Sequence, residues 1–194
     1  TFLNQCYSTC GLDVVPALNI SSTLFNLTSV VFMSMGVADG ILMGQMLGAS
    51  APKEEVKDYS RKLIAISVTA GVIFGGLTAA LSAVFPHIYN TSHEVRTLAG
   101  RLILIMAAFM AFDAFANAAY FILRSGGQTY ITFLFDSGFV WAVMVPLAYC
   151  LSRFTGMAIL PLYLICQSTN MLKAVLGYIF LHQGKWIQNL AIDR

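Results

Sequence analysis

Charged residues are scarce in this sequence. Asp, Glu, Lys and Arg make up 10% of its 194 residues, whereas soluble domains contain about 25%. Hydrophobic residues make up 58%, and the mean hydropathy is +0.74. This balance excludes an ordinary soluble domain and predicts a chain that lies in a lipid bilayer.

Several motifs of other protein classes are missing as well. The four cysteines form no Cys-x-x-Cys pair, no glycine-rich nucleotide-binding loop occurs, and the basic residues form no cluster typical of nucleic-acid binding. The three histidines lie near predicted helix ends. We therefore expect no enzyme activity, no cofactor, no nucleic-acid partner and no metal apart from a coupling ion.

Long apolar segments are the main feature that is present. A helix needs roughly 20 mainly apolar residues to span a membrane, and the segments 14–48, 61–89, 95–123, 129–151 and 156–183 satisfy this. Residues 1–9 have the pattern of a truncated helix. Short connections predict an all-α antiparallel bundle of about six transmembrane helices. Because the chain begins with Thr inside a helical pattern, we expect it to be a fragment of a larger protein.

Cationic residues are unevenly distributed between the two predicted ends of the bundle. One end carries those of the 49–60 linker, the turn after residue 123 and the C-terminal tail, while the other carries only Arg96, Arg101 and Arg153. By the positive-inside rule, the linker and the C-terminus are expected in the cytoplasm. The sequence thus predicts a multi-pass protein of the plasma or inner membrane.

Small residues recur every four positions on the first two full spans. The two ridges are Gly36, Gly40, Gly44 and Gly48, and Gly71, Gly75, Ala79 and Ala83. Small residues at this spacing allow two helices to approach closely. We expect the two ridges to pack these spans together, as a structural feature and not a binding motif.

Polar residues lie on one helical face of the first full span, at Asn19, Ser22, Asn26 and Ser29. Such a face either makes hydrogen bonds to other helices or lines a hydrated cavity, and the pattern leaves both interpretations open. A second stripe runs along segment 95–123. Its members are Met106, Met110, Asp113, Asn117, Tyr120 and Arg124.

Asp113 is the strongest functional candidate. It lies in the apolar stretch 102–123, where an ionised carboxylate costs several kcal/mol unless the fold uses or neutralises it. Asn117 and Tyr120 add oxygen atoms one and two turns away, which suits a monovalent cation or a proton relay. We predict a cation-coupling site for Na⁺ or H⁺ at these three residues, in a cavity lined by Met106, Met110 and the polar face.

Three further charged residues lie at a similar depth from the predicted cytoplasmic helix ends: Asp39, Asp136 and Lys173. Three acids and one lysine in one layer favour cation binding or protonation of an acid. Alternatively, Lys173 pairs with one aspartate while the others reach water near the inner surface. We expect the second arrangement for Asp39 and Asp136.

Three parts of the sequence carry a family resemblance. They are residues 14–20, residues 35–49, and Asp113-Ala114 followed by Leu123-Arg124 and Thr129. Together they resemble the C-terminal lobe of the multidrug and toxic compound extrusion (MATE) family, over nearly the whole chain. The resemblance implies one lobe of a twelve-helix fold whose two lobes face a central cavity, so the N-terminal lobe is the missing partner. It also implies that Asp113 matches an acid used in cation coupling.

The resemblance further implies a function. Members export organic, often cationic and lipophilic, drugs or other xenobiotics by alternating access, driven by Na⁺ or H⁺. Ion and substrate would favour opposite-facing states of the antiporter. Three alternatives remain: a flippase for lipid-linked or polysaccharide precursors, a membrane-embedded hydrolase with Asp113 and Asp136 as its acid pair, and a purely structural membrane subunit. Membrane lipid and small organic substrates are the other expected partners.

Overall fold

The computed structural model describes residues 7, 11, 13–49, 51–127, 129–154, 158–184 and 186–187, without the side chains of residues 129, 131, 135, 136, 152 and 154. Throughout this part of the chain the regular structure is helical and no strand occurs, which confirms the all-α expectation. The predicted helix at 1–9 lies outside the described residues except for Tyr7, which is helical and buried.

Four described helices are long and apolar enough to cross a membrane. They are α2 (Val14–Gly48), α3 (Lys53–Leu81), α4 (His93–Ser125) and α7 (Ile159–Gln183). The span expected at 61–89 begins earlier, because the charged residues expected in a linker form the first turns of α3. Glu54 and Glu55 stabilise this N-terminus by facing the positive end of the helix dipole. After α3, the 3₁₀ helix η1 (Phe85–Ile88) leads to α4.

The span expected at 129–151 is built from several consecutive pieces. They are α5 (Thr129–Phe133), the π-helical turns η2 (Leu134–Gly138) and η3 (Val140–Met144), and α6 (Val145–Phe154). Pro146 is the second residue of α6, two positions after the last residue of η3. Proline provides no backbone N–H and clashes with the carbonyl one turn earlier, which explains why the regular α-helical pattern is interrupted here.

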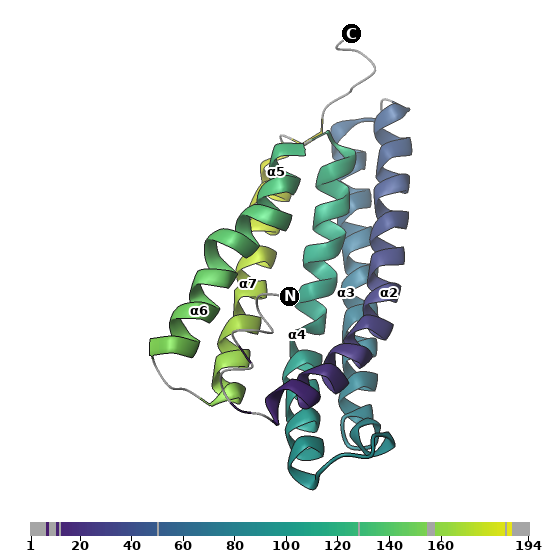
Figure 1. The fold of residues 1–194 in the computed structure, drawn as a ribbon. Coiled ribbons are helices and arrows are strands. Elements are labelled where there is room, and N and C mark those ends of the chain that lie inside the picture. Colours follow the sequence, from purple (N-terminus) through teal and green to yellow (C-terminus); the bar gives the residue numbers. More distant parts are fainter. Residues whose placement is uncertain are drawn as a thin grey trace.

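Helix α4 is the centre of the bundle, with α2, α3 and α7 packed around it (Figure 1). Three buried clusters follow one another along α4. Ala99 belongs to the cluster with the N-terminal parts of α2 and α7, Met110 packs with Phe32 near the middle, and Ile122 belongs to the cluster with the α2–α3 connection and Trp186. The α2–α3 connection and the C-terminal end of α7 therefore lie at the same end of the bundle.

The glycine ridges make close helix contacts, but their main partner differs from the prediction. A Cβ on Gly36 would collide with the Phe121 ring of α4, and one on Gly75 would lie 2.9 Å from the Ala107 carbonyl oxygen, also on α4. At Gly44 a Cβ would meet nothing within 4 Å. The expected direct packing of the two ridges is thus wrong, because both ridges face α4, although α2 and α3 also contact each other at other residues.

Candidate cation site

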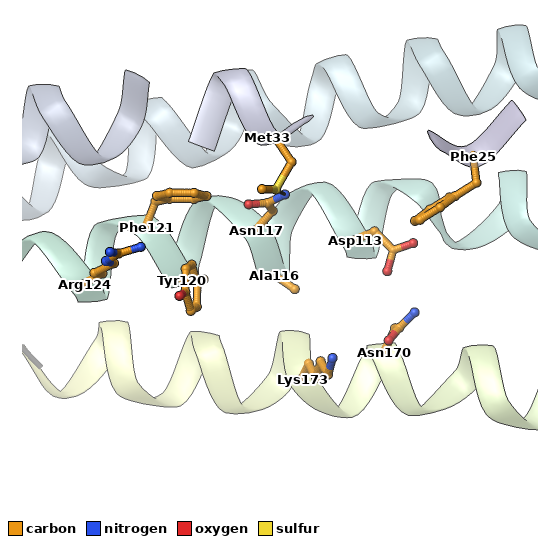
Figure 2. A pocket seen from close by; sticks show the side chains of 10 residues that line it. All are labelled: Phe25, Met33, Asp113, Ala116, Asn117, Tyr120, Phe121, Arg124, Asn170 and Lys173. Atoms are coloured by element: carbon orange, nitrogen blue, oxygen red, sulfur yellow. Dashed lines mark hydrogen bonds between the residues drawn. The ribbon is translucent and has the colours of Figure 1, made fainter. Parts of the chain in front are cut away.

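A cavity of about 430 Å³ lies between α2, α4 and α7. Ten described residues line it, and Figure 2 shows their side chains. Helix α4 contributes six of them, α2 contributes Phe25 and Met33, and α7 contributes Asn170 and Lys173. The cavity therefore collects polar groups from two helices that are far apart in the sequence, against an apolar wall supplied by α2.

Asp113 projects from α4 into this cavity, toward Asn170 and beside the Phe25 ring (Figure 2). Its Oδ2 atom is buried and accepts no hydrogen bond from the described residues. The positive charge of Lys173 acts on the carboxylate from α7. Burial disfavours the ionised carboxylate and the Lys173 charge only partly offsets this, so the buried oxygen is suited to accept a proton or to coordinate a cation.

The cavity also brings together Asn117, Tyr120 and Arg124, which follow Asp113 along α4. The Asn117 side-chain amide donates a hydrogen bond to Met33 Sδ at 3.8 Å. The Tyr120 ring packs edge-on against Phe121, with ring centroids 5.3 Å apart. The three residues predicted for cation coupling therefore share one cavity. The Asn117 amide, however, contacts α2, and the polar side chains that lie across the cavity from Asp113 come from α7.

The contribution of α7 was only partly visible in the sequence. Lys173 was expected at the depth of Asp113, and the structure places it in the same cavity, with Nζ 5.2 Å from the centroid of the Phe139 ring. Asn170 was missed, although it is an amide inside an apolar span, three residues before Lys173. Two polar residues at this spacing share a helix face, which is the signal that would have identified it.

Met106 and Met110 were expected to line the cavity, and this expectation is wrong. Their side chains are 1% and 0% exposed, and neither lines the cavity around Asp113. Met110 packs with Phe32 and Ala114 in the middle of the bundle. On a crowded central helix, neighbouring faces contact different helices, so one stripe in the sequence is divided between the core and the cavity.

The polar face of α2 lies outside this cavity. Asn19, Ser22 and Asn26 are exposed and Ser29 is partly exposed. The hydroxyls of Ser22 and Ser29 donate hydrogen bonds to backbone carbonyls within α2, at 3.0 and 2.9 Å. These two described hydrogen bonds are therefore internal to α2 and do not connect it to another helix. That the face lines a cavity with another lobe stays a prediction.

Asp39 is separated from the candidate site. It is 5% exposed, does not line the Asp113 cavity, and accepts a hydrogen bond at 2.9 Å from the Ser67 hydroxyl of α3. The expectation that Asp39 reaches water is therefore wrong, because α3 covers it. The side chain of Asp136 lies outside the described part of the structure.

The Asp39–Ser67 bond predicts a measurable effect on stability. Ser67→Ala removes the described donor to a buried carboxyl group, which we expect to destabilise the fold by about 1–3 kcal/mol. Asp39→Asn keeps an oxygen that accepts the Ser67 hydrogen bond, so its effect is expected to be smaller. Thermal unfolding of the purified protein in detergent checks the order of the two variants, and equal melting temperatures for Ser67→Ala and the unmodified protein would contradict it.

Comparisons with known proteins identify a family and several curated relatives of this chain. The MatE family model matches residues 5–150. The chain is 32% identical over 150 residues to a protein named "Probable multidrug resistance protein NorM" from Pasteurella multocida, covering 75% of this chain and 31% of that protein. It is also 32% identical over 140 residues to "Multidrug resistance protein MdtK" from Yersinia pestis, covering 70% and 28%.

The chain thus spans less than a third of the length of these curated relatives. No solved structure matches the chain significantly.

Proposed function

Since this chain belongs to the MatE family, we propose that it forms one lobe of a membrane antiporter that exports small organic cations in exchange for Na⁺ or H⁺. The names of its relatives as multidrug resistance proteins support export of drugs. The observation that carries the proposal is the buried Asp113 Oδ2, which faces a cavity and lacks a hydrogen-bond donor among the described residues. A second lobe, absent from this chain, completes the transport pathway.

Asp113 is the group that binds the coupling ion in this proposal. A proton or Na⁺ neutralises its carboxylate, which removes much of the cost of holding the charge among apolar side chains. The positive charge of Lys173 on α7 attracts the ionised carboxylate, so ion binding at Asp113 weakens the electrostatic attraction between α4 and α7. A change in attraction between two helices shifts the balance between two arrangements of the bundle, and this shift is how ion binding promotes drug release.

The remaining polar residues of the cavity have supporting roles. Tyr120 supplies a phenol oxygen along the path between Asp113 and the inner end of α4, and Asn170 faces Asp113 from α7 (Figure 2). Asn117 holds α4 to α2 through Met33, so it positions the cavity wall. Coupling therefore rests on Asp113, with Asn117, Tyr120 and Asn170 adjusting its surroundings.

We also propose that the end with the α2–α3 connection and the C-terminus faces the cytoplasm. The α2–α3 connection and the C-terminal end of α7 lie together at one end of the bundle, where Trp186 packs with Leu47 and Val56. Among the described residues, that end carries Lys53, Lys57, Arg61, Lys62 and Arg124, in agreement with the positive-inside rule.

Transport by the full-length protein tests the proposed function. Ethidium, a fluorescent organic cation, is added outside inverted membrane vesicles, whose lumen corresponds to the cell exterior, and a Na⁺ gradient or a proton gradient directed out of the lumen is imposed separately. We expect one of the two gradients to drive ethidium movement, and that gradient identifies the ion. Movement that is the same with and without each gradient would contradict ion coupling.

Lys173 provides a prediction within the same assay. Lys173→Gln removes the charge that competes with the coupling ion, so the ion concentration at half-maximal transport should fall, by roughly three- to tenfold. Lys173→Arg keeps the charge and serves as the control. The ion dependence of the transport rate gives the values. An unchanged or raised half-maximal concentration in Lys173→Gln would show that the Lys173 charge does not weaken binding of the coupling ion at Asp113.

A further inference from the structure

A second cavity, of about 610 Å³, lies between α3 and α7. Phe115 of α4 forms part of its wall, and the other described lining residues belong to α3 and α7. Phe115 follows Asp113 by two residues, which is about 200° around an α-helix. The groove therefore opens on a different side of α4 from the candidate cation site, and Figure 1 shows α4 between α7 and α3.

The groove has a cationic end and an apolar body. Lys57 and Arg61 lie on the first turns of α3, and His182 lies on the last turn of α7, at the end of the bundle that holds the α2–α3 connection. Further from that end, the lining becomes mostly apolar. It includes Ile64, Ala65, Val68, Phe115 and Tyr178.

The positive charge of this end is not neutralised by nearby acids in the described structure. The described lining contains no carboxylate, and the ion pair found on this part of α3 joins Asp58 to Lys62 at 2.7 Å. Arg61 acts on Asp58 only as a secondary charge. Lys57 and Arg61 thus face the groove with their charge available to an anionic group.

The length of the groove fits one leaflet of a bilayer. From Lys57 to Thr69, the lining residues of α3 extend over twelve residue-to-residue steps, or about 18 Å at the helical rise. Half of the hydrocarbon core of a bilayer is about 15 Å thick. The outer surface of α3 beside the groove is apolar and exposed, with Ile66 and Val72 at 60% and 59%. This surface is suited to contact with lipid.

We propose that the groove between α3 and α7 binds an anionic phospholipid. Its phosphate group lies between Lys57, Arg61 and His182, and one acyl chain lies along Ile64, Val68 and the other apolar residues of the body. Basic pockets between membrane helices on the cytoplasmic side are suited to anionic headgroups, and each Lys or Arg adds favourable electrostatic energy there. The site is independent of Asp113, so it stands whether or not Asp113 couples transport.

Lipid binding to the purified full-length protein tests this site. Native mass spectrometry in mild detergent measures bound phosphatidylglycerol and, separately, phosphatidylcholine with the same acyl chains. Lys57→Gln/Arg61→Gln is compared with Lys53→Gln/Lys62→Gln, which makes the same change in net charge on the same helix outside the groove. We expect phosphatidylglycerol affinity to fall about tenfold or more in the first variant and to change little in the second.

Two further experiments distinguish binding of a phospholipid from binding of a small phosphate compound. Glycerol phosphate, which has the same charged group without acyl chains, should not compete with phosphatidylglycerol at equal concentration. Ala65→Trp fills the partly open body of the groove without replacing a buried residue, and it should also weaken phosphatidylglycerol binding. Equal losses in the two charge variants, equal binding of phosphatidylcholine, or full competition by glycerol phosphate would each overturn the proposal.

Discussion

Asp113→Asn is expected to remove most of the gradient-driven export by the full-length protein while leaving the amount of protein in the membrane unchanged. Asparagine has nearly the same shape but neither binds a proton at neutral pH nor carries the charge that attracts Na⁺. Coupling between two sites is typically 1–3 kcal/mol, or about 5- to 150-fold, so its loss should lower the driven transport rate about tenfold or more. Uptake of ethidium into inverted vesicles under the effective gradient is the measurement.

Asp39→Asn is the matched control for this variant. It makes the same chemical change on a neighbouring helix, but Asp39 does not line the cavity and its Ser67 contact survives in the amide. We expect transport by Asp39→Asn to stay close to that of the unmodified protein. Equal losses in both variants would mean that transport depends on the general charge of the lobe, and full activity of Asp113→Asn would place coupling in the other lobe.

Gly75→Leu is expected to cause the largest loss of stability. A Cβ at this position would lie 2.9 Å from the backbone oxygen of Ala107, and backbone cannot move aside as a flexible side chain does. Overpacking of this kind costs about 1–3 kcal/mol or more, and here it separates α3 from the central helix. The melting temperature of the purified protein in detergent should fall clearly, and the protein should lose its monodisperse peak in size-exclusion chromatography.

Gly76 is a control that the chain itself supplies. It is the next residue on the same helix, and a Cβ there would meet nothing within 4 Å. Gly76→Leu adds the same side chain and favours the helix, so its melting temperature should be unchanged or slightly raised. Similar melting temperatures for the two variants would contradict the close approach of α3 to α4 at Gly75.

The parts of the fold that follow from local sequence were predictable. Long apolar segments gave the helices, and the first span, 14–48, coincides with α2. Helix α3 begins eight residues before its predicted start, because the apolar pattern that predicts a membrane span does not report on a charged first turn that is still helical. Pro146 can interrupt a helix, but the sequence does not show where the π-helical turns before it form, since they depend on how the backbone accommodates the proline.

The arrangement of helices around α4 was not predictable from one sequence. Small residues on two spans show that some helix approaches closely, but they do not identify it, and α4 proved to be the partner. The same limit applies to the site. Asp113 was identified from the cost of its burial, whereas Asn170 and the buried position of Met110 depend on which face of α4 meets α7 and which meets α2.

The most direct test of the central claim is the competition between ion and substrate for the full-length protein. Equilibrium binding of a labelled organic cation is measured at increasing concentrations of the coupling ion, in the unmodified protein and in Asp113→Asn. The account predicts that the ion weakens substrate binding in the unmodified protein and has little effect in the variant, because the two ligands are linked through Asp113. The same ion dependence in both proteins would contradict it.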